Sequence, residues 1–443
     1  MTKLHRRRVH EYPDLVGRPP ASIVFCNGCG VDSMTLLHLW CRQPETRDFA
    51  LDELLVITAI TGDEYRSTIE AANAHLVPLL RAHGIRFVQV ARGGQSTRDG
   101  YDVLADSTAP TELVPRGAWH LGEEMEQALT VPQIVSGRRL CSYRAKGEVL
   151  DSAIADEIAA SRVAPDFRHA VAFAAEETWR AERDSSYTTN ARRPWYPLIE
   201  MGHDRTWCAS YLRTVLKGFI YPRSCCVFCC FQAPRAGRDA LAARWRAEPD
   251  AGAYALHIER GALSINRRMR LFGSLSAAEF IRTREISEVD TLANAELAAE
   301  TTWTVVETRR VYRAASVKNP ATGKSLRGRD GRTIKDPARK GDTWRSIRPH
   351  TVTTTHDDGL AVLTRLAAAY DTVVWTGPDL VSRVDVRIVP DRPREWPLST
   401  HEYTLMPGTV TAKEHAGFDR EWGAARDRET VRGGGVTPLP LAM

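Results

Sequence analysis

The sequence lacks several features that would define common protein classes. No apolar run approaches the roughly 18 residues that a membrane-spanning helix needs, so no membrane association is predicted. The basic segment 1–10 has no apolar stretch behind it and does not resemble a secretory signal peptide. Net charge is low, because 60 basic residues oppose 55 acidic ones and leave +5. We therefore expect a cytoplasmic protein with no membrane partner.

Cysteine is scarce, and its distribution is uneven. Nine cysteines in 443 residues are too few for a disulfide scaffold, and none follows Cys230. Four of them lie between Cys225 and Cys230, a spacing that favours a metal or cluster site in a cytosolic chain. Two thiolates of a Cys-x-x-Cys pair such as Cys226 and Cys229 can reach one ion. The alternative is a group of buried free thiols.

Strand and helix patterns alternate in the first half of the chain. Short apolar runs at 22–26, 54–58 and 85–90 predict buried strands, and helical patterns follow the first two. Residues 169–173 form a plausible later strand. Such alternation predicts an α/β fold with a parallel, doubly wound sheet and helices on both faces.

Composition divides the 443 residues into four predicted parts. They are a basic N-terminal tail (1–20), a nucleotide-binding domain (21–235), a mainly helical extension (236–315) and a small C-terminal α+β region (316–443). In the last part, the residue pattern predicts a helix at 360–369 and strands at 372–375 and 384–389.

A basic segment opens the C-terminal region. Residues 318–348 contain ten Lys and Arg against three Asp, and their four glycines favour a loop. Lys and Arg spaced in this way can track a phosphate backbone, which makes a nucleic acid the expected partner of this segment. The alternative is a solvated loop.

The segment Asn27–Ser33 joins the first strand to a helix. Glycines at such a turn let backbone N–H groups converge on an anion, and the helix N-terminus adds its dipole. Ser33 can donate a hydrogen bond, and Asp32 can help hold a metal ion. One alternative is a tight turn with a capping serine, and another is a redox pair formed by Cys26 and Cys29.

Six segments resemble the sequence elements of a known superfamily and follow the same order along the chain. Gly28–Ser33 is similar to the Ser-Gly-Gly-x-Asp-Ser loop of PP-loop ATP pyrophosphatases and phosphoadenylylsulfate (PAPS) reductases, and more closely to the Gly-Gly-Gly-Val-x-Ser variant of phage and mobile-element members. The other five segments that resemble family elements are Thr61–Glu64, Arg139–Lys146, Glu177–Arg180, Tyr196–Glu200 and Ser224–Phe231. Three positions depart from the family pattern: Gly28 replaces its Ser, Cys29 replaces a Gly, and Ile60 replaces an Asp.

The resemblance implies an adenine nucleotide alpha-hydrolase-like (Rossmann-like) fold that binds ATP with Mg²⁺. By this resemblance the nucleotide-binding residues are Asn27, Gly28, Cys29, Gly30, Val31, Asp32, Ser33, Thr61, Gly62 and Glu64. The implied catalytic residues are Asp32, Ser33, Lys146, Glu177 and Arg180.

The cysteine spacing is similar to that of adenylylsulfate reductases, which hold a 4Fe-4S cluster. The implied ligands are Cys141, Cys208, Cys226 and Cys229, with Cys225 or Cys230 as the alternative fourth ligand and zinc as the second choice of metal. The reductases also use a C-terminal cysteine, which this sequence lacks.

The expected function is ATP-dependent adenylation coupled to sulfur transfer onto a nucleic acid. The resemblance implies this chemistry because tRNA thiolation and DNA phosphorothioation sulfurtransferases are among the proteins that the sequence resembles. A cysteine desulfurase or other complex partners would supply the sulfur. Two alternatives stay open: a reductase-like enzyme acting on an adenylylated sulfur compound, and a non-catalytic Fe-S module that binds a nucleotide or nucleic acid.

Overall fold

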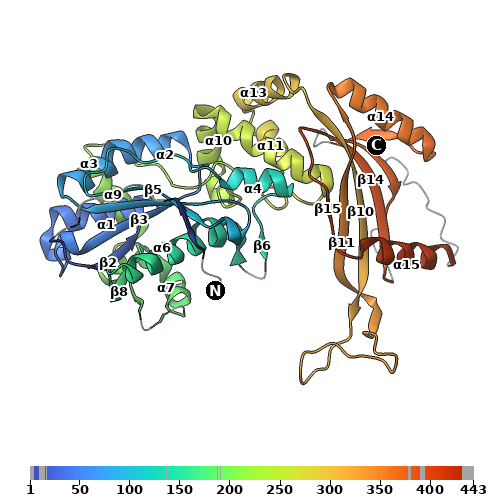
Figure 1. Cartoon of the computed structure of the whole chain (residues 1–443). Helices are drawn as coiled ribbons and strands as arrows, with labels where there is room; N and C mark the ends of the chain where they lie inside the picture. Colours follow the sequence, from blue (N-terminus) through green and yellow to red (C-terminus); the bar gives the residue numbers. More distant parts are fainter. Residues whose placement is uncertain are drawn as a thin grey trace. The chain divides into compact units, whose positions relative to one another are not determined.

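The computed structural model describes residues 4–8, 15, 17–135, 138–186, 188–189, 191–377, 381–389 and 395–431 (Figure 1). The chain divides into two compact units, one of residues 1–125 and 132–252 and one of residues 126–131 and 253–443. No helix among the described residues is long and apolar enough to cross a membrane. Part of the predicted N-terminal tail, including 9–14, lies outside the described residues, and Arg6–Arg8 forms a short strand.

The first unit is built on a mixed sheet with the order β1-β5-β4-β3-β2-β8-β9. Neighbouring strands run parallel except β4 and β5, which run antiparallel. The strands are β1 (Arg6–Arg8), β2 (Ala21–Cys26), β3 (Leu54–Ile60), β4 (Arg86–Arg92), β5 (Tyr101–Ser107), β8 (Val163–Ala170) and β9 (Arg193–Trp195). The three early strands are thus confirmed, whereas the later strand starts before residue 169 and ends at Ala170.

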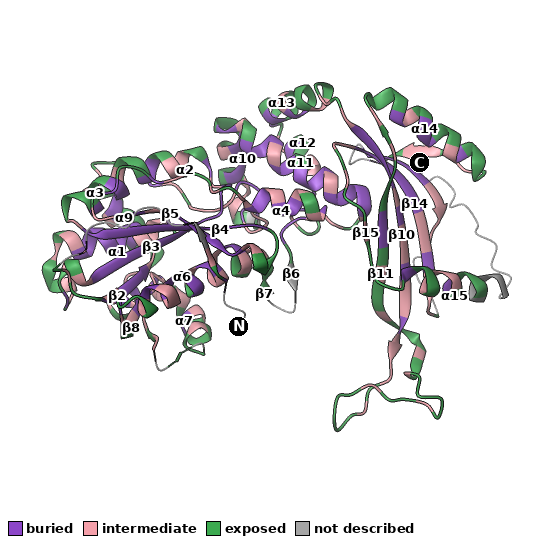
Figure 2. Cartoon of the chain, in the orientation of Figure 1, coloured by how far each residue is buried: buried purple, intermediate pink, exposed green. Residues whose placement is uncertain are grey.

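Helices cover both faces of this sheet, as the strand–helix alternation predicts. Side chains alternate across a strand, so Ile23 and Phe25 of β2 pack into one core with α1 and α9, while Val24 packs into the opposite core with α6. The central strands β3 and β4 are buried along their whole length, whereas β8 and β9 are partly exposed (Figure 2). The helices of the first unit are α1 (Val31–Arg42), α2 (Arg66–Ala71), α3 (Val77–Ala82), α6 (Glu148–Ala159), α7 (Thr178–Ser185), α8 (Pro197–Glu200), α9 (Arg205–Val215) and α10 (Arg238–Ala247).

The connectivity creates a switch point at β2. The chain leaves β2 for β3 and β4 on one side and returns with β8 and β9 on the other. In open α/β sheets, ligands bind outside the carboxyl ends of the strands at such a point. The shorter elements α4 (Leu121–Ala128), β6 (Ile134–Val135), β7 (Arg138–Arg139) and α5 (Leu140–Ser142) follow β5.

The second unit contains helices and an antiparallel sheet of order β12-β13-β14-β10-β11-β15. Its helices are α11 (Pro249–Ile265), α12 (Ala277–Thr283), α13 (Ser287–Ala298), α14 (His356–Ala369) and α15 (Phe418–Val431). Its strands are β10 (Trp303–Ser316), β11 (Lys335–Thr353), β12 (Val374–Thr376), β13 (Ser382–Arg387), β14 (Leu398–Pro407) and β15 (Lys413–Glu414). The predicted C-terminal helix and two strands are present within a few residues of their expected bounds.

The segment 236–315, expected to be mainly helical, contains α10 to α13 and ends in the long strand β10. One prediction for this unit needs correction. The basic segment 318–348, expected to be a loop, includes most of β11. The difference has a physical cause: β10 and β11 pair with each other over most of their length, and this antiparallel pairing outweighs the low strand propensity of Gly, Lys and Asp.

Candidate nucleotide and cysteine site

The β2–α1 loop (27–30) is held by side-chain hydrogen bonds at the switch point. Asn27 Oδ1 accepts from the Cys29 backbone N–H at 3.0 Å, and Asn27 Nδ2 donates to Thr58 Oγ1 of β3 at 3.1 Å. The Gly28 N–H donates to Ser33 Oγ at 3.4 Å. The helix α1 begins at Val31 directly after Gly30, so its positive N-terminal end lies at this loop.

Cys29 has the left-handed backbone conformation, with φ 52°. A side chain in this conformation costs about 1 kcal/mol relative to glycine. We therefore expect Cys29→Gly to be about 1 kcal/mol more stable to unfolding than Cys29→Ala, because both lose the thiol and only glycine relieves the strain. Urea denaturation of the two variants measures the difference, and equal midpoints and slopes would show that the strain is absent.

A cavity of about 150 Å³ lies at the carboxyl ends of β2 and β3. Four of the predicted nucleotide-binding residues and one predicted catalytic residue line it, namely Asn27, Gly28, Cys29, Glu64 and Lys146. Thr61 and Gly62 support Glu64 through hydrogen bonds. The Glu64 carboxylate accepts from the Thr61 hydroxyl at 2.6 Å and from the Gly62 N–H at 3.1 Å. The cavity thus combines the β2–α1 loop with the turn that follows β3.

Lys146 brings a positive charge to this cavity. It lies in a π-helical turn, Tyr143–Gly147, between α5 and α6, and such turns are frequent at functional sites. Burial opposes the charge, but the neighbouring Cys226 and Glu64 outweigh burial and raise the pKa of Lys146. The side chain is therefore a cation suited to a phosphate group.

A second charged group surrounds the start of α1. Arg205 Nη2 lies 3.3 Å from Asp32 Oδ2 and 3.0 Å from Glu177 Oε1, and Arg180 Nη1 lies 2.9 Å from that same Glu177 oxygen. Burial raises the pKa of Glu177, but Arg180 and Arg205 outweigh it and the net shift is downward. The structure brings together three predicted catalytic residues, Asp32, Glu177 and Arg180, and adds Arg205, which no sequence motif marked.

Two carboxylate oxygens of this group are buried without a hydrogen-bond partner. They are Asp32 Oδ1 and Glu177 Oε2. Buried acceptors are normally satisfied, and carboxylate oxygens are the ligands that Mg²⁺ prefers. The residues present therefore fit a magnesium ion.

The cysteine loop (Ser224–Phe231) is attached to the same site. The Ser224 hydroxyl donates to the Gly28 carbonyl at 2.6 Å, and the Val227 N–H donates to the Asp63 carbonyl at 2.8 Å. Cys226 Sγ lies 3.4 Å from Thr61 Oγ1. The loop thereby connects the two turns that line the cavity.

Five thiols gather at this loop. Burial first, and then the nearby Cys229, raises the pKa of Cys141 and brings that of Cys225 to about 11. Burial, Cys229 and Cys141 raise the pKa of Cys230 to about 12. Among the described residues, no group of three or more His, Cys, Asp or Glu side chains is arranged as a formed metal site. The donor set, four cysteines of one loop beside Cys141, nevertheless fits a soft metal by its chemistry.

Cys208, one of the predicted ligands, lies apart from these thiols. It is buried in the core between α9 and α1, where the Thr35 hydroxyl donates to its carbonyl at 3.2 Å. Burial and then Asp32 raise the pKa of its thiol to about 12. Its position on the inner face of α9, against α1, favours Cys225 or Cys230 over Cys208 as the predicted fourth ligand.

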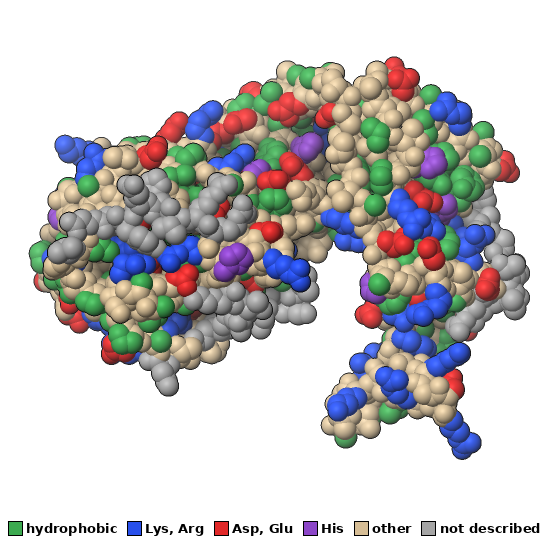
Figure 3. All heavy atoms as spheres, in the orientation of Figure 1, with side chains coloured by type: hydrophobic (Ala, Val, Ile, Leu, Met, Phe, Trp, Pro, Cys, Tyr) green, Lys and Arg blue, Asp and Glu red, His purple; other side chains and the backbone are tan. Residues whose placement is uncertain are grey.

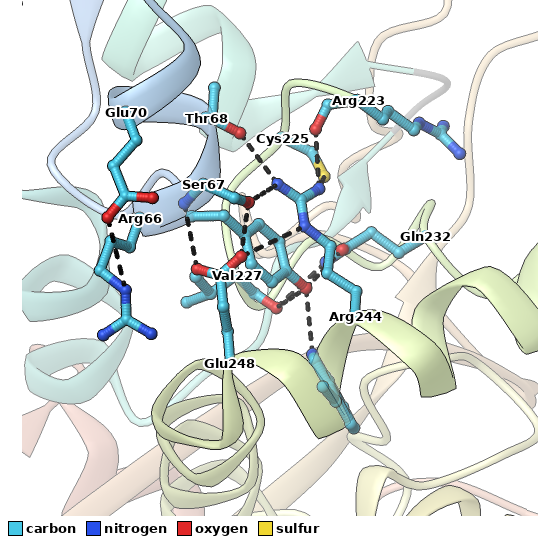
Figure 4. Close-up of polar contacts among 12 residues, drawn as sticks. Arg66, Ser67, Thr68, Glu70, Arg223, Cys225, Val227, Gln232, Arg244 and Glu248 are labelled. Atoms are coloured by element: carbon cyan, nitrogen blue, oxygen red, sulfur yellow. Dashed lines mark hydrogen bonds and ion pairs between the residues drawn. The ribbon is translucent and has the colours of Figure 1, made fainter. Parts of the chain in front are cut away.

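A network of hydrogen bonds holds the backbone of the cysteine loop (Figure 4). The Gln232 side-chain amide donates to the carbonyls of Cys226 at 2.9 Å and Val227 at 3.0 Å, and its oxygen accepts from Tyr65 at 2.6 Å. Arg244 donates to the Thr68 hydroxyl at 2.9 Å and to the Arg223 carbonyl at 2.7 Å. These bonds fix the loop backbone against α2 and α10.

A cysteine–histidine pair also reaches the cavity. Cys26 lines it, and Cys26 Sγ lies 2.9 Å from His169 Nε2. Arg192 Nε donates to His169 Nδ1 at 2.5 Å, which leaves the proton of a neutral imidazole on Nε2, facing the thiol. All nine cysteines are free thiols, so the structure contains no Cys26–Cys29 disulfide. Sequence reasoning missed His169 and Arg192 because they are distant in the chain.

In comparisons with known proteins, no protein-family model, no curated protein and no solved structure matches this chain.

Proposed function

We propose that the first unit cleaves ATP to AMP and pyrophosphate, adenylates a substrate and thereby enables sulfur transfer, with a nucleic acid as the acceptor. The observation that carries this proposal is the cavity at the carboxyl end of β2. It combines the backbone of the β2–α1 loop with the Lys146 cation at a switch point, the position where open α/β sheets bind ligands.

Each residue of the site has a role in this reaction. The loop N–H groups and Lys146 would hold the phosphates of ATP, because both present positive charge to an anion. Asp32 and Glu177 would hold Mg²⁺ through their free oxygens. A bound Mg²⁺ neutralises charge that develops on the phosphates. Arg205 and Arg180 orient the two carboxylates, and Arg205 bridges both.

The cysteine loop supplies the second part of the proposal. Cys141, Cys226 and Cys229, with Cys225 or Cys230, would hold a 4Fe-4S cluster, with zinc as the second choice. Such a group can stabilise the fold or handle sulfur. The hydrogen bonds from the cysteine loop to Gly28 and Asp63 join it to the nucleotide cavity, which supports a common role.

The Cys26–His169 pair favours one alternative. The Cys26 thiol, which lines the cavity, could attack the sulfonyl sulfur of adenylylsulfate, with AMP as the leaving group and the thiol proton passing to solvent. An added dithiol would then reduce the resulting S-sulfonate and release sulfite, which would give this chain a reductase-like activity without a C-terminal cysteine. Release of sulfite from adenylylsulfate in the presence of a dithiol, lost in Cys26→Ser, would establish that activity in place of adenylation.

Product analysis of the full chain with ATP and Mg²⁺ tests the proposal. We expect turnover to increase with the acceptor nucleic acid, and AMP and pyrophosphate to appear in equal amounts when a sulfide source is also present, because sulfur then displaces AMP from the adenylated substrate. ADP and phosphate as products would contradict the proposed cleavage. ATP binding without any turnover, under all acceptors tried, would support the non-catalytic module instead.

A further inference from the structure

The strands β10 and β11 continue beyond their sheet as a two-stranded ribbon. β10 pairs with β14 only from Trp303 to Tyr312, whereas its pairing with β11 goes on to Ser316 and Lys335. β15 covers β11 only at Ser346 and Ile347. The part of the hairpin from 313 to 341, here called the basic arm, therefore projects from the sheet (Figure 1).

The local sequence explains how the arm forms. The pairing register shifts at Ala314, opposite Lys340, which marks a β-bulge. A Cβ at Gly341 would lie 2.7 Å from the Ala314 carbonyl oxygen, so glycine allows the two backbones to approach here. At the far end, backbone hydrogen bonds connect Val317, Leu326 and Ile334 in a small folded tip.

The arm carries a strong excess of positive charge. Residues 318–340 contain eight Lys and Arg against two Asp, a local net charge of +6. The basic side chains of this stretch are exposed (Figures 2 and 3), and they are Lys318, Lys324, Arg327, Arg329, Arg332, Lys335, Arg339 and Lys340.

These charges are largely uncompensated within the described chain. Arg332 lies 3.8 Å from Asp330, and both side chains are more than half exposed. Lys324, Arg329 and Arg339 form no ion pair with any residue that the structure describes. Like charges at this density repel one another, and an anionic partner relieves this repulsion.

We propose that the basic arm binds duplex DNA and enters its major groove. A major groove about 12 Å wide admits a two-stranded β-ribbon, and flanking Lys and Arg can then contact the phosphates on both sides. The deep, narrow major groove of duplex RNA does not admit side chains. Proteins that bind single strands use aromatic platforms, and residues 317–340 contain no Phe, Tyr or Trp.

This inference deepens the proposed function, on which it rests for the role of DNA as acceptor. The arm belongs to the second unit and the nucleotide cavity to the first. DNA binding by the arm needs no ATP, whereas basal pyrophosphate release, measured without nucleic acid, uses only residues of the first unit. The two proposals can therefore fail separately.

The test measures fluorescence anisotropy of labelled 20-base-pair DNA with the full chain, without nucleotide, over a range of salt concentrations. The variant replaces Lys324, Arg329 and Arg339 with Ala. We expect binding at least about tenfold weaker at 0.1 M salt, and a slope of log K against log salt that is smaller by about two to three, because each lost phosphate contact removes about 0.9.

A matched variant controls for the loss of three charges. It replaces Arg213, Arg282 and Arg365, which are exposed on the helices α9, α12 and α14, with Ala. We expect this variant to bind DNA within about twofold of the unaltered chain. Circular dichroism melts of both variants check that they fold.

Competition distinguishes the nucleic acids. We expect unlabelled duplex DNA to displace the probe at concentrations at least about tenfold lower than duplex RNA or single-stranded DNA of the same sequence. Equal competition by these nucleic acids would overturn groove entry, and an unchanged slope in the arm variant would overturn the arm as the binding element. Absence of binding to DNA would overturn the inference, while pyrophosphate release in the same preparation decides the proposed function on its own.

Discussion

Replacing Asp32 with Asn is expected to lower the release of pyrophosphate from ATP by roughly 100- to 1000-fold. Asp32 stands in the first turn of α1, and its Oδ1 is buried without a hydrogen-bond partner. Asparagine keeps the size of the side chain but removes the charge that would hold Mg²⁺. Initial rates at saturating ATP, measured over a range of Mg²⁺ concentrations, give the effect, and the Mg²⁺ requirement should rise along with the loss of rate.

Asp48→Asn is the matched control. Like Asp32, Asp48 forms an ion pair with an arginine, in this case Arg168. Its side chain, however, is 69% exposed. An exposed pair of this kind contributes about 0–1 kcal/mol to stability, so its rate should stay within about twofold. Full activity of Asp32→Asn would contradict the magnesium role, as would an equal loss in both variants.

Replacing Cys226 and Cys229 with Ser is expected to remove most of the bound iron, or zinc, and to destabilise the first unit. The two cysteines occupy one tight turn, in which the Cys229 N–H donates to the Cys226 carbonyl at 3.0 Å. Ser is a poor ligand for soft metals, and loss of a structural metal costs several kcal/mol of folding free energy, roughly 10 in small zinc domains. Metal and acid-labile sulfide analysis of anaerobically purified protein, with a thermal melt, measures both effects.

Cys208→Ala separates loss of a ligand from loss of a core thiol. Its thiol is buried in the core against α1 rather than at the cysteine loop. We expect this variant to be destabilised by about 1 kcal/mol through lost packing, with its metal content unchanged. Metal loss in Cys208→Ala comparable to that in the double variant would restore Cys208 as a ligand, and the absence of any metal in the unaltered chain would contradict the cluster.

Local sequence patterns predicted the strands that position the cavity at β2. β3 is buried along its whole length and reads as an almost continuous apolar run, and β2 carries a similar run at Ile23–Cys26. β4 is also buried, although it contains Arg86, Gln89 and Arg92. The positive φ of Cys29 was foreseeable because the similar family loop has glycine there. The reversed direction of β5 was not predicted, because its pairing with β4 depends on contacts beyond the local sequence.

The remaining differences come from contacts between distant residues. Cys208 was chosen by its place in the chain, but the side of α9 that faces α1 decides where its thiol lies. Arg205 joins Asp32 across 173 positions, and His169 reaches Cys26 across 143. The sequence did not predict the ribbon of β10 and β11. Its glycines and charged residues have low strand propensity, and the pairing of the two strands, not their composition, forms the ribbon.

Hydrogen–deuterium exchange of the full chain, with and without α,β-methylene-ATP and Mg²⁺, measures directly whether the cavity at β2 binds ATP. We predict slower exchange in the β2–α1 loop, in the turn Thr61–Glu64 and around Lys146, because these segments line or support the cavity. Binding that leaves these segments unprotected, or the absence of binding at millimolar nucleotide, would contradict a nucleotide site at this position.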